Sequence, residues 1–198
     1  MSKKIVYMVF KGPGKEYAPE YKDVPKGVEV WGVNNSIFDR KMDKCFYLHY
    51  PEDTAEYREI RLEGNAKEIT IVCQDKLVGW DKQEKYPFSD IVKKYGVGYF
   101  SNSIAFMIAY AMYNDFKEIH IWGAPLDSQA EYIFEKAGVE YWIGYAMGLG
   151  VKVVVHGLST IMRTKDDKVY GWDKKLGSVV RDWKVLYRAK DLLSLAKR

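Results

Sequence analysis

Six short apolar runs, each closed by glycine, proline or small polar residues, recur along this chain of 198 residues. They are Ile5 to Phe10, Val28 to Val33, Lys44 to His49, Glu68 to Cys73, Glu118 to Trp122 and Lys152 to Val155. Runs this short fit β-strands, and their largely continuous apolar character is typical of strands that are buried on both faces.

The segments between these runs predict helices. Residues 104 to 114 have one apolar stripe at helical spacing, formed by Ile104, Met107, Ile108, Ala111 and Met112. A second helix is expected over residues 139 to 149, separated at Gly138 from a lid-like segment over 127 to 136. The polar stretch 75 to 95 predicts a loop followed by a short helix.

Buried strands that alternate with helices favour a parallel sheet covered on both sides. We therefore predict an α/β, Rossmann-like nucleotide-binding domain over residues 1–163, with about six largely parallel strands and helices on both faces. Residues 164–198 are basic and are expected to form an extension that packs on the same domain.

Composition narrows the function classes. A net charge of +4 permits an anionic ligand but only weakly favours nucleic acid as a partner. No apolar run approaches the roughly 20 residues of a membrane span, and the first run is too short for the core of a signal peptide. We therefore expect a cytoplasmic protein that does not associate with a membrane. Cys45 and Cys73 are expected to be buried and reduced, and the cysteines and histidines show no metal-ligand spacing.

Ligands of open parallel sheets bind beyond the carboxyl ends of the strands, so the residues after each run are candidates for the site. Lys11, Gly12 and Gly14 follow the first run, and glycines let backbone amides approach a phosphate. The motif lacks the third glycine of a dinucleotide fingerprint and the ending of a P-loop, so a plain turn is the alternative.

Further polar residues follow the second and third runs. Asn34 and Asn35 can donate and accept hydrogen bonds, as recognition of a base or ribose requires, or they simply form a turn. His49 is a candidate general acid or base, against the alternative of a structural histidine. His120 is expected to lie in the core, and His156 is ambiguous.

Ser101, Asn102 and Ser103 precede the oily helix. Small polar residues cap most helices without any ligand, but free amides and hydroxyls at a helix start can also hold phosphate.

Carboxylates are expected at the rim after the fifth run. Asp127 and Glu140 are the acid or base candidates there, and Glu131 and Tyr132 are candidate ligand contacts. With a break at Gly138, Glu131 and Glu140 could face one pocket, whereas one unbroken helix would put them on opposite sides.

Several motifs in order carry a resemblance. The first-turn GPG is followed by VEVWGVNNSIFDRKMDKCFYLH, then YFSNSIAFMIAYAMYNDFKEIHIWGAPLD, then AEYIFEKAGVEYWIGYAMGLGVKVVV. Over residues 4 to 160 this pattern resembles small Rossmann-like proteins of bacteriophages, mostly of unassigned function. It is more distantly similar to bacterial lipooligosaccharide sialyltransferases and to hydroxymethylpterin diphosphokinase-like proteins.

The resemblance implies a nucleotide-phosphate cleft. Its lining would comprise Gly12, Gly14, Asn34, Asn35, Ser101, Asn102 and Ser103. Glu131, Tyr132, Glu140 and Tyr141 would mark the lid and its helix. After the fifth run these relatives have glycine, any residue and aspartate, whereas this chain has Gly123-Ala124-Pro125, with the nearest aspartate at Asp127.

Two functions follow as hypotheses. The first is a transferase that moves a glycosyl or phosphoryl-type group from an activated nucleotide donor, with chemistry that rests on positioning and phosphate stabilisation. The second is a non-catalytic protein that binds a host signalling nucleotide and so counters antiviral defence. Both take a small nucleotide ligand, and both leave a homo-oligomer open.

Overall fold

The computed structural model describes residues 4–49, 68–77, 80–126, 130–157 and 159–163. Seven strands form one sheet in the order β5-β4-β3-β2-β1-β6-β7, and all six pairings are parallel. They are β1 Ile5–Val9, β2 Val28–Val33, β3 Lys44–Tyr47, β4 Thr70–Cys73, β5 Gln83–Lys85, β6 Glu118–Trp122 and β7 Lys152–Val155. The basic C-terminal extension predicted at 164–198 lies outside the described residues.

The Rossmann-like α/β prediction is confirmed, and each of the six predicted strands is present within two residues at either end. The seventh strand, β5, was not predicted because its sequence, Gln-Glu-Lys, has no apolar run. A short charged strand is what the edge of a sheet tolerates, since charged side chains there oppose pairing with another chain.

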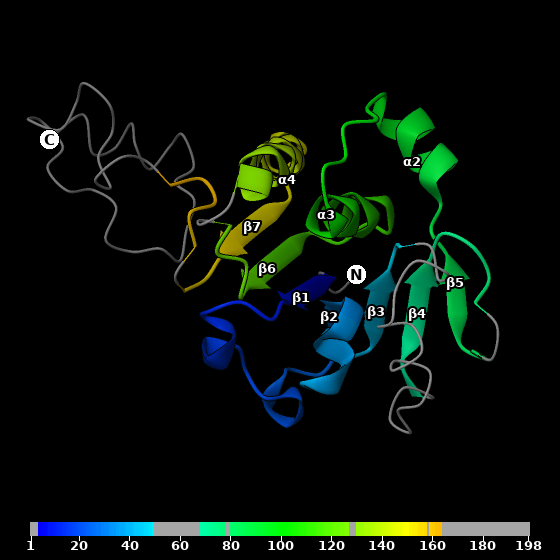
Figure 1. Ribbon diagram of the computed structural model, residues 1–198, viewed down its shortest axis with the longest axis vertical. Helices are drawn as coiled ribbons and strands as arrows, with labels where there is room; N and C mark the ends of the chain where they lie inside the picture. The colour runs from blue at the N-terminus through cyan, green and yellow to red at the C-terminus, as the bar shows by residue number, and fades with distance from the viewer. Residues whose placement is uncertain (1–3, 50–67, 78–79, 127–129, 158, 164–198) are drawn as a thin grey trace, which may run out of the picture.

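Helices cover both faces of the sheet, as predicted, and the described helices on the two faces are of different kinds (Figure 1). On one side lie α2 Phe88–Tyr95, α3 Ser103–Tyr113 and α4 Ala130–Gly148. On the other side the described helices are short 3-10 turns, η1 Lys15–Tyr17, η2 Tyr21–Asp23 and η3 Asn34–Phe38. Two separate apolar clusters fill the two layers, and Cys45 and Cys73 are buried and free in the second.

Aromatic rings hold α3 between the sheet and α4. Phe100, which precedes α3, stacks on Phe106 at 4.3 Å between ring centroids and on Trp142 of α4 at 4.9 Å. At the far edge, the Tyr86 hydroxyl donates to the Phe106 carbonyl at 2.9 Å, and the Tyr110 hydroxyl donates to Glu84 of β5. These contacts fix the start of α3 near the carboxyl ends of the strands.

The break predicted at Gly138 is wrong, because α4 continues through it from Ala130 to Gly148. The glycine serves a close approach instead. A Cβ at position 138 would overlap the Ser101 hydroxyl and would lie 2.8 Å from the Ser101 Cβ. Within the described residues, no helix is long and apolar enough to cross a membrane.

We expect Gly138→Ala to destabilise the protein although alanine favours a helix. The added methyl has to displace the segment that carries Ser101, and overpacking of this kind costs roughly 1–3 kcal/mol. For a chain of this size each kcal/mol lowers the melting temperature by about 2–4 °C, which calorimetry measures.

Gly144→Ala is the matched control in the same helix. A Cβ there meets no atom within 4 Å, so in dilute solution the melting temperature should rise slightly. A Gly138→Ala variant as stable as Gly144→Ala would contradict the close approach.

Candidate functional site

The candidate site lies where the order of the sheet reverses. β1 pairs with β2 on one side and β6 on the other, so the connections after β1 and β6 leave in opposite directions. The loops after these strands touch, because the Gly12 amide donates to the Gly123 carbonyl at 2.9 Å. A Cβ on Gly12 would overlap the Pro125 ring, so the contact between the loops is sufficient reason for this glycine.

The glycine-rich turn is filled by acidic side chains of the chain itself. Gly14 has a left-handed φ of 94°, and its amide donates to the Glu16 carboxylate at 3.0 Å. Lys15 and Lys11 lie 2.9 and 3.6 Å from Asp39, and the hydrogen bond from Lys15 is the main cause that lowers the pKa of that carboxyl. A phosphate at this turn would have to replace Glu16.

Asn34 and His49 are brought together, as their positions after adjacent strands predict. The Asn34 Nδ2 lies 3.2 Å from the His49 Nε2. The parallel register of β1 and β2 runs as far as Met8 beside Trp31, and Lys11 and Asn34 come shortly after the ends of these two strands. Lys11, Asn34 and His49 therefore follow three adjacent strands at one edge of the sheet, and Asn35 is the next residue of η3.

Asn34 carries two marks of a functional residue. Its φ of 49° is in the left-handed region, which non-glycine residues seldom adopt. Its side-chain Oδ1 is buried and has no hydrogen-bond partner in the described part of the chain. Backbone strain and an unmatched buried acceptor both cost stability, and such costs gather at binding sites.

The start of α3 is fastened to α4. Asn102 is the N-cap, with its Oδ1 accepting from the Ala105 amide at 3.1 Å, and Ser103 is the first helical residue. The Ser101 hydroxyl donates to the Glu135 carbonyl at 2.9 Å, and the Asn102 Nδ2 donates to the Glu135 carboxylate at 3.3 Å. These contacts account for the polar residues without a ligand, so phosphate binding there remains a prediction.

The break at Gly138, on which the predicted convergence of Glu131 and Glu140 depends, is absent. Glu131 and Glu140 belong to one unbroken helix, and positions nine residues apart lie on opposite sides of its axis. The Glu140 carboxylate accepts from the Met162 amide at 2.6 Å and lies 3.6 Å from Lys136. Tyr132 also belongs to α4, and Asp127 lies outside the described residues.

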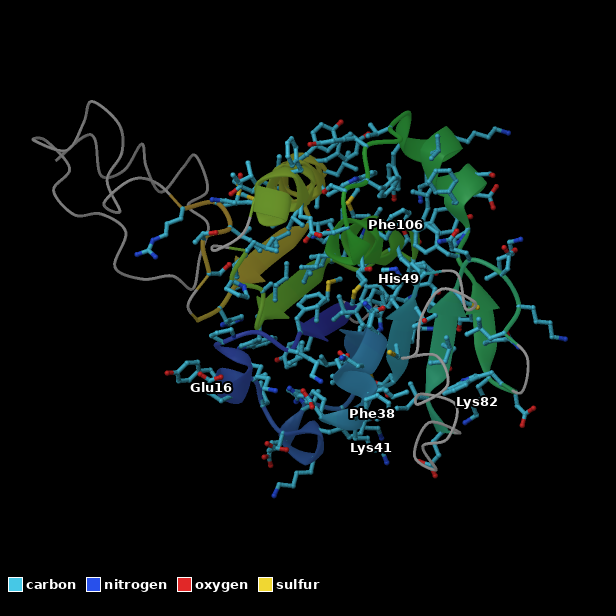
Figure 2. All side chains as sticks on the ribbon, viewed as in Figure 1. Glu16, Phe38, Lys41, His49, Lys82 and Phe106 are labelled. Atoms are coloured by element: carbon cyan, nitrogen blue, oxygen red, sulfur yellow. The ribbon has the colours of Figure 1, made fainter. Side chains whose placement is uncertain are left out.

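Two of the pockets lined by described residues are large, and neither of these two is lined by Asn34 or His49. The larger, of ≈ 930 Å³, lies at the amino ends of the strands and includes Lys41 and Lys82, which Figure 2 shows away from His49. The smaller, of ≈ 690 Å³, lies between the end of β1 and the 3-10 turns and includes Lys15 and Arg40. The smaller pocket borders the glycine-rich turn.

Sequence reasoning missed a linked pair of histidines. His120 Nδ1 lies 2.8 Å from His156 Nε2, and His120 Nε2 lies 2.8 Å from the buried Glu118, which also binds Lys152. The ring of His156 stacks on Trp122 at 4.0 Å. Only the pairing of β6 with β7 could have joined residues 36 positions apart. Among the described residues, no group of three or more histidine, cysteine, aspartate or glutamate side chains is placed to hold a metal ion.

Comparison with solved structures finds the same fold. The sialyltransferase CstII from Campylobacter jejuni, in complex with the substrate analogue CMP-3FNeuAc, gives a TM-score of 0.53 at 16% identity, covering 77% of this chain and 81% of that chain. The sialyltransferase CST-II with a trisaccharide acceptor and CMP gives 0.54 at 16% identity, with the same coverage. No protein-family model and no curated protein matches the chain.

We expect Asn34→Gly to stabilise the protein. Glycine adopts a φ of 49° without strain, and the variant removes the unmatched buried oxygen, whose cost is roughly 1–3 kcal/mol. Against this stand the lost contact with His49 and the greater freedom of the unfolded chain, so the net gain is about 1 kcal/mol. Thermal unfolding should shift upward by about 2–4 °C.

Asn34→Ala separates the backbone from the side chain. It removes the same amide but keeps a Cβ in the left-handed region, so its melting temperature should fall below that of Asn34→Gly. Equal melting temperatures for the two variants would show that Asn34 is not strained.

Proposed function

We propose that this chain binds a nucleotide at the carboxyl ends of β1, β2 and β3 and transfers a glycosyl or phosphoryl-type group from an activated nucleotide donor. The observation that carries the proposal is Asn34, held in a left-handed conformation with a buried acceptor that no described residue matches, at the edge where parallel sheets bind ligands. A hydroxyl or amine of a base or ribose would supply the missing donor.

The surroundings of Asn34 suit an anionic ligand with a polar head. Lys11 follows β1, the strand that pairs with β2 before Asn34, and its side chain is 40% exposed despite its contact with Asp39. Lys15 lies on the same carboxylate, so two cations share one anion at this edge. A phosphate that binds here would compete with Asp39 for the lysines rather than meet an uncompensated positive charge.

The shared fold supports a nucleotide donor in particular. The sialyltransferases with this fold were solved with CMP and with the substrate analogue CMP-3FNeuAc, and one also holds a trisaccharide acceptor. Their 16% identity supports the fold and the kind of ligand for this proposal, and leaves the sugar and the acceptor open.

His49 is the proposed acid or base. Its side chain is exposed, and its Nε2 lies 3.2 Å from Asn34 Nδ2. As an acid, the ring would give a proton to the phosphate oxygen that departs when the donor bond breaks. Asp127 and Glu140 are the candidates that would take the proton of the acceptor hydroxyl.

One observation favours the second candidate function, a binding protein that sequesters a signalling nucleotide. Glu140 is already engaged by the Met162 amide and by Lys136, so its carboxylate is poorly placed to take a proton. Holding a nucleotide intact needs the contacts of Asn34 and Lys11 but no base.

Calorimetric titration with CMP, nucleotide sugars, cyclic nucleotides and ADP-ribose tests the proposal. We expect at least one to bind, and Asn34→Ala to raise its dissociation constant about 10-fold or more, equivalent to about 1.4 kcal/mol. Lys82→Ala is the control, because Lys82 lines the pocket at the opposite edge and its loss should leave affinity unchanged. If Lys82→Ala weakens binding and Asn34→Ala does not, the ligand lies at the amino ends instead.

Turnover then separates the two functions. In a transferase, His49→Ala should lower the rate of donor consumption by roughly 100- to 10,000-fold with little change in affinity. In a sequestering protein, chromatography recovers the ligand intact from wild type and His49→Ala alike. No binding of any of these nucleotides would refute both functions.

A further inference from the structure

The outer side of α4 has the opposite polarity to that of an ordinary surface helix. From 133 onward the exposed positions are all apolar or glycine: Ile133, Phe134, Ala137, Tyr141, Gly144, Gly148 and, just past the helix, Leu149. The three charged residues of this stretch, Glu135, Lys136 and Glu140, are half-buried, so they are less exposed than the apolar positions. A helix that is apolar on every side is normally buried on every side.

The apolar side chains on this face are large and well exposed. Phe134 is 76% exposed, Ile133 70% and Tyr141 40%, and Tyr99, at 46%, packs edge-on against Tyr141 at 5.6 Å. Together with Leu149 they expose on the order of 500 Å² of apolar surface, near the upper end for a monomer. Figure 1 shows α4 above β7, at one end of the helical layer, with α3 as its neighbour towards the middle of the sheet.

Within the part of the chain that the structure describes, no contact requires the two exposed glycines. A Cβ at Gly144 or at Gly148 would meet no atom within 4 Å, whereas Gly138 in the same helix is required by Ser101. Glycine weakens a helix relative to alanine. Two glycines that no described contact requires therefore indicate that another molecule approaches the helix closely at these positions.

The large side chains on this face are complementary in shape to the glycine positions on the same face. The large side chains Ile133 and Phe134 lie in the first half of the helix, and Gly144 and Gly148 lie in the second half. If two copies of α4 pack antiparallel, with a two-fold axis between positions 140 and 141, Ile133 of one copy meets Gly148 of the other and Ala137 meets Gly144. The face is therefore complementary to itself, as a two-fold interface requires.

We propose that the protein forms a two-fold symmetric dimer through this face of α4, packed antiparallel. The charges at the border are compatible with self-association, because Lys136 and Glu140 on one flank have opposite signs and lie 3.6 Å apart. With Tyr99 and Leu149 included, the exposed apolar area of about 500 Å² is about 60% of the roughly 800 Å² that each partner of a stable interface buries, and the polar border of the face would supply the rest. The proposal does not depend on the nucleotide site.

Sedimentation equilibrium of the full chain tests the dimer. The wild type should have twice the 23.0 kDa chain mass, and Phe134→Lys should sediment as a monomer with an unchanged circular dichroism spectrum. The matched control is Tyr17→Lys, which places the same charge on a residue that is 67% exposed but lies on η1. It should remain a dimer.

A second variant keeps the test sharp if Phe134→Lys fails to fold. The double variant Gly144→Ala, Gly148→Ala should raise the dimer dissociation constant at least tenfold, while its melting temperature in dilute solution rises. A role confined to the monomer predicts the stabilisation without the loss of association.

Cross-linking tests the antiparallel register. A short thiol cross-linker should join two copies of Tyr141→Cys, which lies next to the proposed axis, and should not join Ile133→Cys, whose two copies would lie about 22 Å apart along the helices. The native cysteines are both buried and should not interfere. A monomeric wild type, a dimeric Phe134→Lys variant, or equal cross-linking at both positions would overturn the proposal.

Discussion

The position of β1 inside a fully parallel sheet, between β2 and β6, is the constraint on which the remaining structure depends. Because all six strand pairings are parallel, every strand end that carries a polar turn comes to the same edge of the sheet. The loops after β1 and β6 touch before they leave in opposite directions, and Gly12 is the residue that allows this close contact. The geometry of the candidate site is thus a consequence of strand order rather than of any local motif.

At this edge the protein supplies its own anions to the groups that would otherwise hold a phosphate. Glu16 accepts from the Gly14 amide, Asp39 lies between two lysines, and Glu135 faces the start of α3. Each carboxylate satisfies a donor that would be costly to leave unpaired. A phosphate gains only the difference between its own contacts and those of the carboxylate that it displaces, so these places favour a ligand of high charge. Asn34 is different, since a ligand there fills an acceptor that the described chain leaves unmatched.

Most of the fold follows from the sequence because its signal is local. Buried parallel strands are continuous apolar runs, and all six such runs were recognised; β5 escaped because its pairing depends on β4 beside it and not on its own side chains. Gly138 was misread for a similar reason, since a glycine is required there by the close approach of Ser101, which lies far away in the sequence. The site was harder still. Adjacent strands bring Asn34 to His49, but the strain at Asn34 and the link between His120 and His156 exist only in three dimensions.

The continuity of α4 connects the start of α3 with the exposed apolar face. If Gly138 ended one helix and began another, the exposed glycines and the large apolar side chains would belong to separate segments, and no single stripe would exist. As one rigid rod of 19 residues, α4 instead binds Ser101 and Asn102 through Glu135 on its inner side and presents Phe134, Tyr141 and Gly144 outward. A partner that fixes the outer side would also fix the position of Glu135 at the start of α3. The proposed dimer would therefore act on the start of α3 through one helix, without any need for a change in the sheet.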